Sequence, residues 1–262
     1  MITLANNAEL PYSSLASGSG NVSVASDPFG FSPLYMPLVT NVTKAFKGAA
    51  IFNQVVDFTG FGAITDLISV FEGAAAFSQI VSYDASNITS LYRSFMGTSI
   101  PNITLSSSNT DPTLAVLTNL ESSFEGCSLL TAFNIEVLFT KVTTAKNLFK
   151  NCPLLNNNVT IVSDELTTVE SILEGCASFN SNLVLNSPKL VDLTNALTGA
   201  VIMSGDITCT APLLTQDLGK NDPSDTFKIS RLYNGVVQYL GDLDNMTNYD
   251  CIWTTDITKA FN

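Results

Sequence analysis

The feature of this chain that most constrains its fold is a unit of about 24 residues that recurs from residue 39 to residue 209. Seven units begin, in order, at Val39, Ile64, Ile88, Leu117, Val142, Leu166 and Leu190, with spacings of 25, 24, 29, 25, 24 and 24 residues. A unit of this size cannot bury an apolar face by itself, so it is stable only when neighbouring units cover that face. The period therefore predicts a solenoid, in which successive units stack along one axis.

The first part of each unit has the spacing of a short helix. Apolar residues stand at the first, fourth and eighth positions, for example Ile88, Leu91 and Phe95. The second position is Thr in six of the seven units, and a Thr hydroxyl is suited to the N-cap of a helix. The tenth position holds Gly or Asn, which tolerate the positive φ of a helix end. These residues are Gly48, Gly73, Gly97, Gly126, Asn151, Gly175 and Gly199.

The second part of each unit has the pattern of a short strand. Two apolar residues are separated by a single residue, which is the alternation of a strand with one buried face. The pairs are Val56 and Phe58, Val81 and Tyr83, Ile103 and Leu105, Phe133 and Ile135, Val159 and Ile161, Leu183 and Leu185, and Ile207 and Cys209. We expect these strands to lie parallel and to form a sheet along one side of the stack.

These residues resemble a known repeat. The run Phe52-Asn53-Gln54, the run from Asp84 to Leu91 with Phe95, and the similar runs at 124–127, 149–152 and 173–176 resemble the BspA-like leucine-rich-repeat surface proteins. The resemblance covers about two thirds of the chain, although Phe58 or Tyr83 stands where the family usually has Trp. It implies a leucine-rich-repeat-like solenoid of about seven strand-plus-short-helix units, with a binding or structural role at a bacterial, protist or large-virus surface. It carries no catalytic residue.

The two ends of the chain are expected to differ from the repeat region at residues 39–213. Residues 1–38 and 214–262 are predicted to cap the open ends of the core. The C-terminal segment ends in a half-repeat, because Ile257-Thr258-Lys259-Ala260-Phe261 matches Val42-Thr43-Lys44-Ala45-Phe46. We expect a neighbouring subunit or a separate partner to complete this half-repeat through Ile257 and Phe261, which would allow head-to-tail self-association. The alternative is that the half-repeat packs back on residues 217–250.

The charge balance excludes several classes of partner. Eleven Lys and Arg against 23 Asp and Glu give a net charge of −12, which argues against binding to nucleic acid or to an anionic membrane. No window is long and apolar enough for a membrane span. The first ten residues have no basic and apolar signal pattern. The chain is therefore expected either to have lost a signal peptide or to be made and assembled inside a cell.

The sequence predicts no catalytic, cofactor or metal site. It has no His, so the usual nucleophile–base pairs cannot form. Cys127, Cys152 and Cys176 are 25 and 24 residues apart, which is the repeat period, so we expect a column of buried small residues rather than metal ligands. The same column would contain Ala49, Ala74, Thr98 and Ala200.

The candidate binding face consists of the strand residues that point away from the core. It contains Asp57, Ser82, Thr104, Asn134, Thr160 and Thr208, with Asn102, Asn158 and Asn182 in a neighbouring column. Such a face could bind a protein or a glycan. The alternative is that Thr and Asn simply suit exposed strand and turn positions.

Taken together, these patterns predict a non-enzymatic structural or assembly protein. We expect it to mediate protein–protein contacts in a virion or in a cell-surface layer. The alternative is a monomeric cell-surface adhesin that binds a host protein or glycan through the strand face.

Overall fold

The computed structural model describes residues 41–53, 56, 64–106, 115–135, 139–200 and 207–210. Five of the seven units, beginning at residues 64, 88, 117, 142 and 166, are described over most of their length. The predicted caps at 1–38 and 214–262, the assembly residues Ile257 and Phe261, and Asp57 of the binding face lie outside the described residues.

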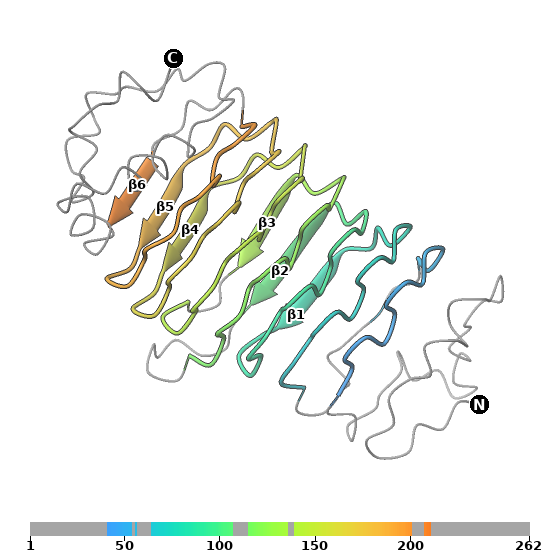
Figure 1. The fold of residues 1–262 in the computed structure, drawn as a ribbon. Helices are drawn as coiled ribbons and strands as arrows, with labels where there is room; N and C mark the ends of the chain where they lie inside the picture. The colour runs from blue at the N-terminus through green and yellow to red at the C-terminus, as the bar shows by residue number, and fades with distance from the viewer. Residues whose placement is uncertain are drawn as a thin grey trace, which may run out of the picture.

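Six short strands follow one another along the stack (Figure 1). They are β1 (Val81–Asp84), β2 (Asn102–Ser106), β3 (Ala132–Ile135), β4 (Val159–Val162), β5 (Leu183–Asn186) and β6 (Ile207–Thr210). They form two parallel three-stranded sheets in the orders β1-β2-β3 and β4-β5-β6. Sequence order and spatial order therefore agree, and each unit lies beside the next.

The register of the sheets aligns the residues that the repeat aligns. Val81 pairs with Ile103 and Ile103 with Phe133, while Leu183 pairs with both Val159 and Ile207. The predictions of strands in units two to seven are confirmed, since each contains the expected apolar pair. The pair in the first unit, Val56 and Phe58, is described only at Val56, which is half-buried.

The strands have one buried and one open face. In β4, Val159 and Ile161 are 1% exposed, whereas Thr160 and Val162 between and after them are exposed. In β5, Leu183 and Leu185 are buried in the same way. β-branched and aliphatic residues at alternate positions therefore bury one side of each strand against the interior of the stack.

The helix prediction is wrong in the described residues, where the first part of each unit is a series of turns. The N–H groups alternate along this segment: one donates to a carbonyl group of its own unit, and the one after it donates to a carbonyl group of the next unit. In the third unit, Ser94 N–H donates to Leu91 O at 3.0 Å within the unit. Leu91, Phe95 and Gly97 instead donate to carbonyl groups of the fourth unit at 2.9, 2.9 and 2.7 Å. An α-helix would use all of these groups internally, whereas here half of them join neighbouring units.

The backbone conformation explains why no helix forms. The sixth position of every unit has a positive φ, between 53° and 58°, in Lys44, Ser69, Arg93, Ser122, Asn147, Ser171 and Asn195. A right-handed helix requires negative φ at every residue, so this single residue ends the helical path. Among these residue types, only Asn is a recognised signal for positive φ. The residues at the sixth position therefore did not predict this conformation.

The prediction for the tenth position is confirmed in its conformation. The six glycines there have φ between 70° and 82°, and Asn151 has φ 58°. The left-handed turn at this position returns the chain toward the strand, although it follows a run of turns and not a helix.

The repeated Thr also has a role other than the predicted N-cap. The N–H and the hydroxyl of Thr143 both donate to the carbonyl oxygen of Thr118 in the preceding unit, at 2.8 and 3.0 Å. Thr167 makes the same two bonds to Thr143, at 2.9 and 3.0 Å. The next residue accepts an N–H group within its own unit, since Asn119 Oδ1 accepts the N–H of Glu121 at 2.8 Å. The hydroxyl thus reinforces the contact between units.

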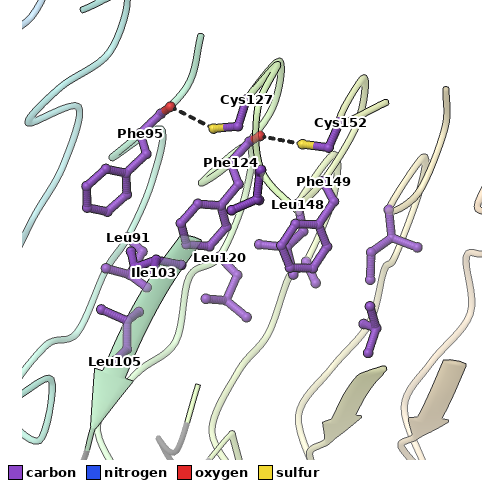
Figure 2. Close-up of a cluster of buried hydrophobic side chains, with 14 of the residues drawn as sticks. Leu91, Phe95, Ile103, Leu105, Leu120, Phe124, Cys127, Leu148, Phe149 and Cys152 are labelled. Carbon is purple, nitrogen blue, oxygen red and sulfur yellow. Dashed lines mark hydrogen bonds between the residues drawn. The ribbon is translucent and has the colours of Figure 1, made fainter. Parts of the chain in front are cut away.

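The core contains a column of stacked aromatic rings, three of which, Phe95, Phe124 and Phe149, are labelled in Figure 2. Phe71, Phe95, Phe124 and Phe149 occupy the eighth position of successive units and are 0% exposed. Their ring centroids are 5.5 to 5.6 Å apart and their planes differ by 8° to 22°. Rings held at this separation gain contact area and favourable offset stacking, so the aromatic column and the backbone bonds enforce the same spacing.

Gly126→Ala is expected to lower the free energy of unfolding by about 1–2 kcal/mol, because an L-residue is strained at φ 71°. The added Cβ would lie 3.7 Å from Gly97 Cα, an ordinary contact, so the cost comes from the backbone conformation. Urea denaturation followed by circular dichroism measures the change. Ser128→Ala, at an exposed position nearby, is the control and should unfold like the wild type. Equal stability of both variants would contradict the assigned conformation.

Candidate functional site

The central column of the candidate face runs across the strands in register. Ser82 pairs with Thr104 and Thr104 with Asn134 in the first sheet, and Thr160 and Thr208 flank Val184 in the second. Neighbouring parallel strands lie about 4.8 Å apart, so the column repeats at that distance. The structure therefore brings the predicted residues together in two rows.

The described side chains of this column differ in exposure. Asn134 and Thr160 are exposed, while Thr104 and Val184 are half-buried. For Ser82 and Thr208, only the pairing of the backbone with the neighbouring strand is described. Among the described outward side chains of β2 to β5, none is charged. The described part of this face therefore offers hydroxyl, amide and methyl groups.

The neighbouring asparagine column has a structural role that weakens its assignment as a binding site. Asn158 Oδ1 accepts the N–H of Asn182 at 3.0 Å, which links two units at the point where β4 and β5 begin. Asn102 is half-buried and pairs with Ala132. The Oδ1 atom of Asn158 is therefore occupied within the stack, and that atom is not free for a ligand.

The sequence analysis missed a second set of structural asparagines. Asn156 Oδ1 accepts the N–H of Asn180 at 2.9 Å and the hydroxyl of Ser181 at 2.8 Å. Asn53 Oδ1 likewise accepts the N–H of Ser78 at 2.9 Å. The recurrence of Asn or Ser before the strand could have predicted this role, because a short polar side chain can accept a hydrogen bond in place of a backbone carbonyl group at a turn.

The charged side chains gather on the turn segments, where they pair between units. Lys146 contacts Glu170 at 2.5 Å and Lys150 contacts Glu174 at 3.0 Å. All four side chains are about a quarter to two fifths exposed, so each pair contributes little to stability. In the described units, the signs of these charges alternate along the stack, so neighbouring units neutralise each other locally.

One ion cluster is more enclosed. Glu72 lies 2.9 Å from Lys47 and 3.7 Å from Arg93, and its side chain is 15% exposed. Burial alone would raise the pKa of Glu72, but hydrogen bonds from Lys47 and Ser69 and the two positive charges outweigh it and hold that pKa below its ordinary value. The carboxylate is ionised at neutral pH and joins three successive units.

The predicted cysteine column is confirmed. Cys127, Cys152 and Cys176 are 0% exposed, as are the residues of the same column in the second and seventh units, Ala74 and Ala200. Each thiol donates to the carbonyl oxygen of the Phe one unit earlier. The distances are 3.1 Å from Cys127 to Phe95 and 3.0 Å from Cys152 to Phe124 (Figure 2). The distance from Cys176 to Phe149 is 3.0 Å.

Burial also sets the chemistry of these thiols. It raises the pKa of Cys152 well above its ordinary value and that of Cys176 to about 12. A protonated thiol is a poor nucleophile, so these two cysteines are structural. Within the described ranges, no three His, Cys, Asp or Glu side chains gather in a way that could hold a metal ion. In the same ranges, no helix has the length and apolar character needed to cross a membrane.

Comparison with known proteins connects the chain to one family. The family described as "Mycoplasma protein of unknown function, DUF285" matches residues 34–132 and again residues 118–262. The two matches overlap and together run from residue 34 to the last residue, far more than half of the chain. No curated protein and no solved structure matches the chain.

Iodoacetamide at pH 8 is expected to leave Cys152 and Cys176 unmodified in the folded protein, because both are buried and protonated. Mass spectrometry of tryptic peptides, with a urea-unfolded sample as the control, measures the modification. The unfolded chain releases thiol protons near the ordinary pKa of 9.0, whereas folded Cys176 keeps its proton up to about 12. The free energy of unfolding should therefore fall as pH rises from 9 toward 12. Rapid alkylation without urea would contradict the assignment.

Proposed function

We propose a function that starts from one premise: this chain belongs to the DUF285 family. That family is found in BspA-like surface proteins, which is compatible with the resemblance of the repeat. From this we infer that residues 39–213 form a leucine-rich-repeat-like solenoid of the BspA kind. Residues 1–38 and 214–262 are proposed to be its caps.

The backbone pairing supports the proposed solenoid. Isolated parallel bridges join Asp66, Ser90, Asn119, Thr144, Thr168 and Asp192 in succession. These residues are the third positions of six consecutive units. One continuous ladder on the turn side and two sheets on the strand side are what a stack of equivalent units requires.

On this scaffold we propose a non-enzymatic structural role, in which the protein mediates protein–protein contacts in a cell-surface layer or a virion. The observation that carries the proposal is that each unit depends on backbone partners in both neighbours. A structure of this kind extends by adding units at its ends, so contacts at the ends are a natural means of assembly. The cysteines are enclosed in the interior and the charged side chains pair between units, so we assign neither group to that role.

The mass of the full chain in solution tests this role. An assembly component should have a weight-average mass above the 28.0 kDa of one chain, and that mass should rise with protein concentration. Multi-angle light scattering after size exclusion, over a wide concentration range, measures it. A single species of 28.0 kDa at every concentration would overturn the assembly role.

A second candidate is a monomeric adhesin that binds a host protein or glycan through the strand face. The observation that favours it is the exposed and uncharged column at Asn134 and Thr160. Small polar side chains at a regular spacing could form many hydrogen bonds with a neutral partner.

The adhesin role predicts that Thr160→Arg weakens binding by about tenfold or more, because a long charged side chain at the centre of the face would block a neutral partner. Arrays of glycans and of extracellular matrix proteins, followed by surface plasmon resonance on any hit, measure this. Thr194→Arg places the same side chain on a turn segment and is the control. Equal binding by both variants would exclude the strand face.

A further inference from the structure

We propose that the segment Ile257–Phe261 of one copy adds a rung to the first described unit, residues 41–53, of a second copy. This inference rests on the proposed assembly role and names the two surfaces that meet. One surface is an edge of backbone acceptors with a half-covered aromatic ring. The other is a segment whose sequence repeats that of the unit it would join.

The acceptor edge follows from the direction of the hydrogen bonds between units. In the third unit, the carbonyl oxygens of Ser90, Tyr92 and Ser94 accept N–H groups of the second unit at 3.0, 2.8 and 2.8 Å. The N–H groups of Lys44 and Phe46 in the first unit donate to the second unit in the same way, at 2.9 and 2.8 Å. At the fourth, sixth, eighth and tenth positions, the donor therefore belongs to the earlier unit and the acceptor to the later one.

The first unit has no earlier unit among the described residues. The carbonyl oxygens at its third, fifth, seventh and ninth positions accept no hydrogen bond from any described residue. These positions are Asn41, Thr43, Ala45 and Lys47. A row of backbone acceptors at the edge of a stack is a template for another segment of chain. The segment that fits must present N–H groups at alternate residues.

The aromatic column ends at the same edge. Phe46 stacks on Phe71 with ring centroids 5.1 Å apart and planes 8° apart. The rings inside the column are fully buried, but Phe46 is only half-buried, although Phe52 also packs against it. One further ring would complete its burial and gain both apolar contact and stacking.

The occupant is identified by the sequence pattern. Ile257, Thr258, Lys259, Ala260 and Phe261 match residues 42–46 at four of five positions, with Ile in place of Val. In the register of the other units, the N–H groups of Ile257, Lys259 and Phe261 would donate to Asn41, Thr43 and Ala45. Phe261 would then occupy the eighth position and stack on Phe46.

The opposite end of the stack is a poorer site for the same segment. The eighth position of the last described unit is Leu197, which is not aromatic and is already 0% exposed. Phe261 would gain little burial against it, whereas Phe46 retains an uncovered part. The two contacting surfaces are different, so the contact is heterologous and can repeat from copy to copy.

Sedimentation equilibrium of the full chain tests the contact. Phe261→Ala should raise the apparent dissociation constant of self-association by about tenfold or more, because the ring supplies the buried anchor. Thr258→Ala is the matched control. Its position corresponds to Thr43, whose side chain is half-exposed, so self-association should be unchanged. Self-association of Phe261→Ala at wild-type strength would overturn this inference and leave the assembly role standing.

A cross-linking experiment identifies the partner surface. A photoreactive phenylalanine analogue at position 261, in a mixture of isotopically light and heavy chains, should cross-link to residues 42–52 and yield mixed light–heavy products. Cross-links confined to one isotope would mean that the segment packs within its own chain and would overturn the inference. Cross-links to residues 190–200 would overturn it as well. A wild-type chain that stays monomeric at every concentration would remove the assembly role itself.

Discussion

Hydrogen bonds between successive units are the constraint on which the rest of this structure depends. In the turn segments, every second N–H group donates to a carbonyl oxygen of the following unit, at 2.6 to 3.1 Å in the described bonds. Those bonds hold the units at the separation at which the rings of Phe95, Phe124 and Phe149 stack. Because a buried backbone group without a partner is costly, each unit requires a neighbour on both sides.

This constraint also decides which side chains remain for function. Repetition places equivalent positions of successive units side by side, so the thiol of Cys127 donates to a carbonyl group one unit away and Lys146 pairs with Glu170. Asn158 and Asn156 use their Oδ1 atoms in the same way. The outward strand face, where Thr160 and Asn134 are exposed, and the edge of the stack are the two surfaces open to a partner. The proposals for adhesion and for assembly rest on these two surfaces.

Prediction from the sequence was most accurate where burial and period act together. The alternating pairs such as Val159 and Ile161 fixed the strands and their register, because a slip of one residue would expose the whole apolar set. The candidate site was only partly predictable. Its strand positions followed from the alternation, but the internal use of Asn158 depends on a contact with the next unit. The helices were predicted wrongly, since the spacing of Ile88, Leu91 and Phe95 also fits a series of turns.

The sequence by itself determined the period, the buried column of Cys127, Cys152 and Cys176, and the positive φ at the tenth position. Each depends on residue types that have few alternatives at those places: small residues in a narrow slot, and Gly or Asn in a left-handed turn. Only the tertiary structure decided that the turn segments bond to their neighbours and not to themselves. The physical reason is that a lone unit cannot supply the carbonyl partners of its own fourth, sixth, eighth and tenth N–H groups once its sixth residue has a positive φ. Those partners exist only when the next unit is in place.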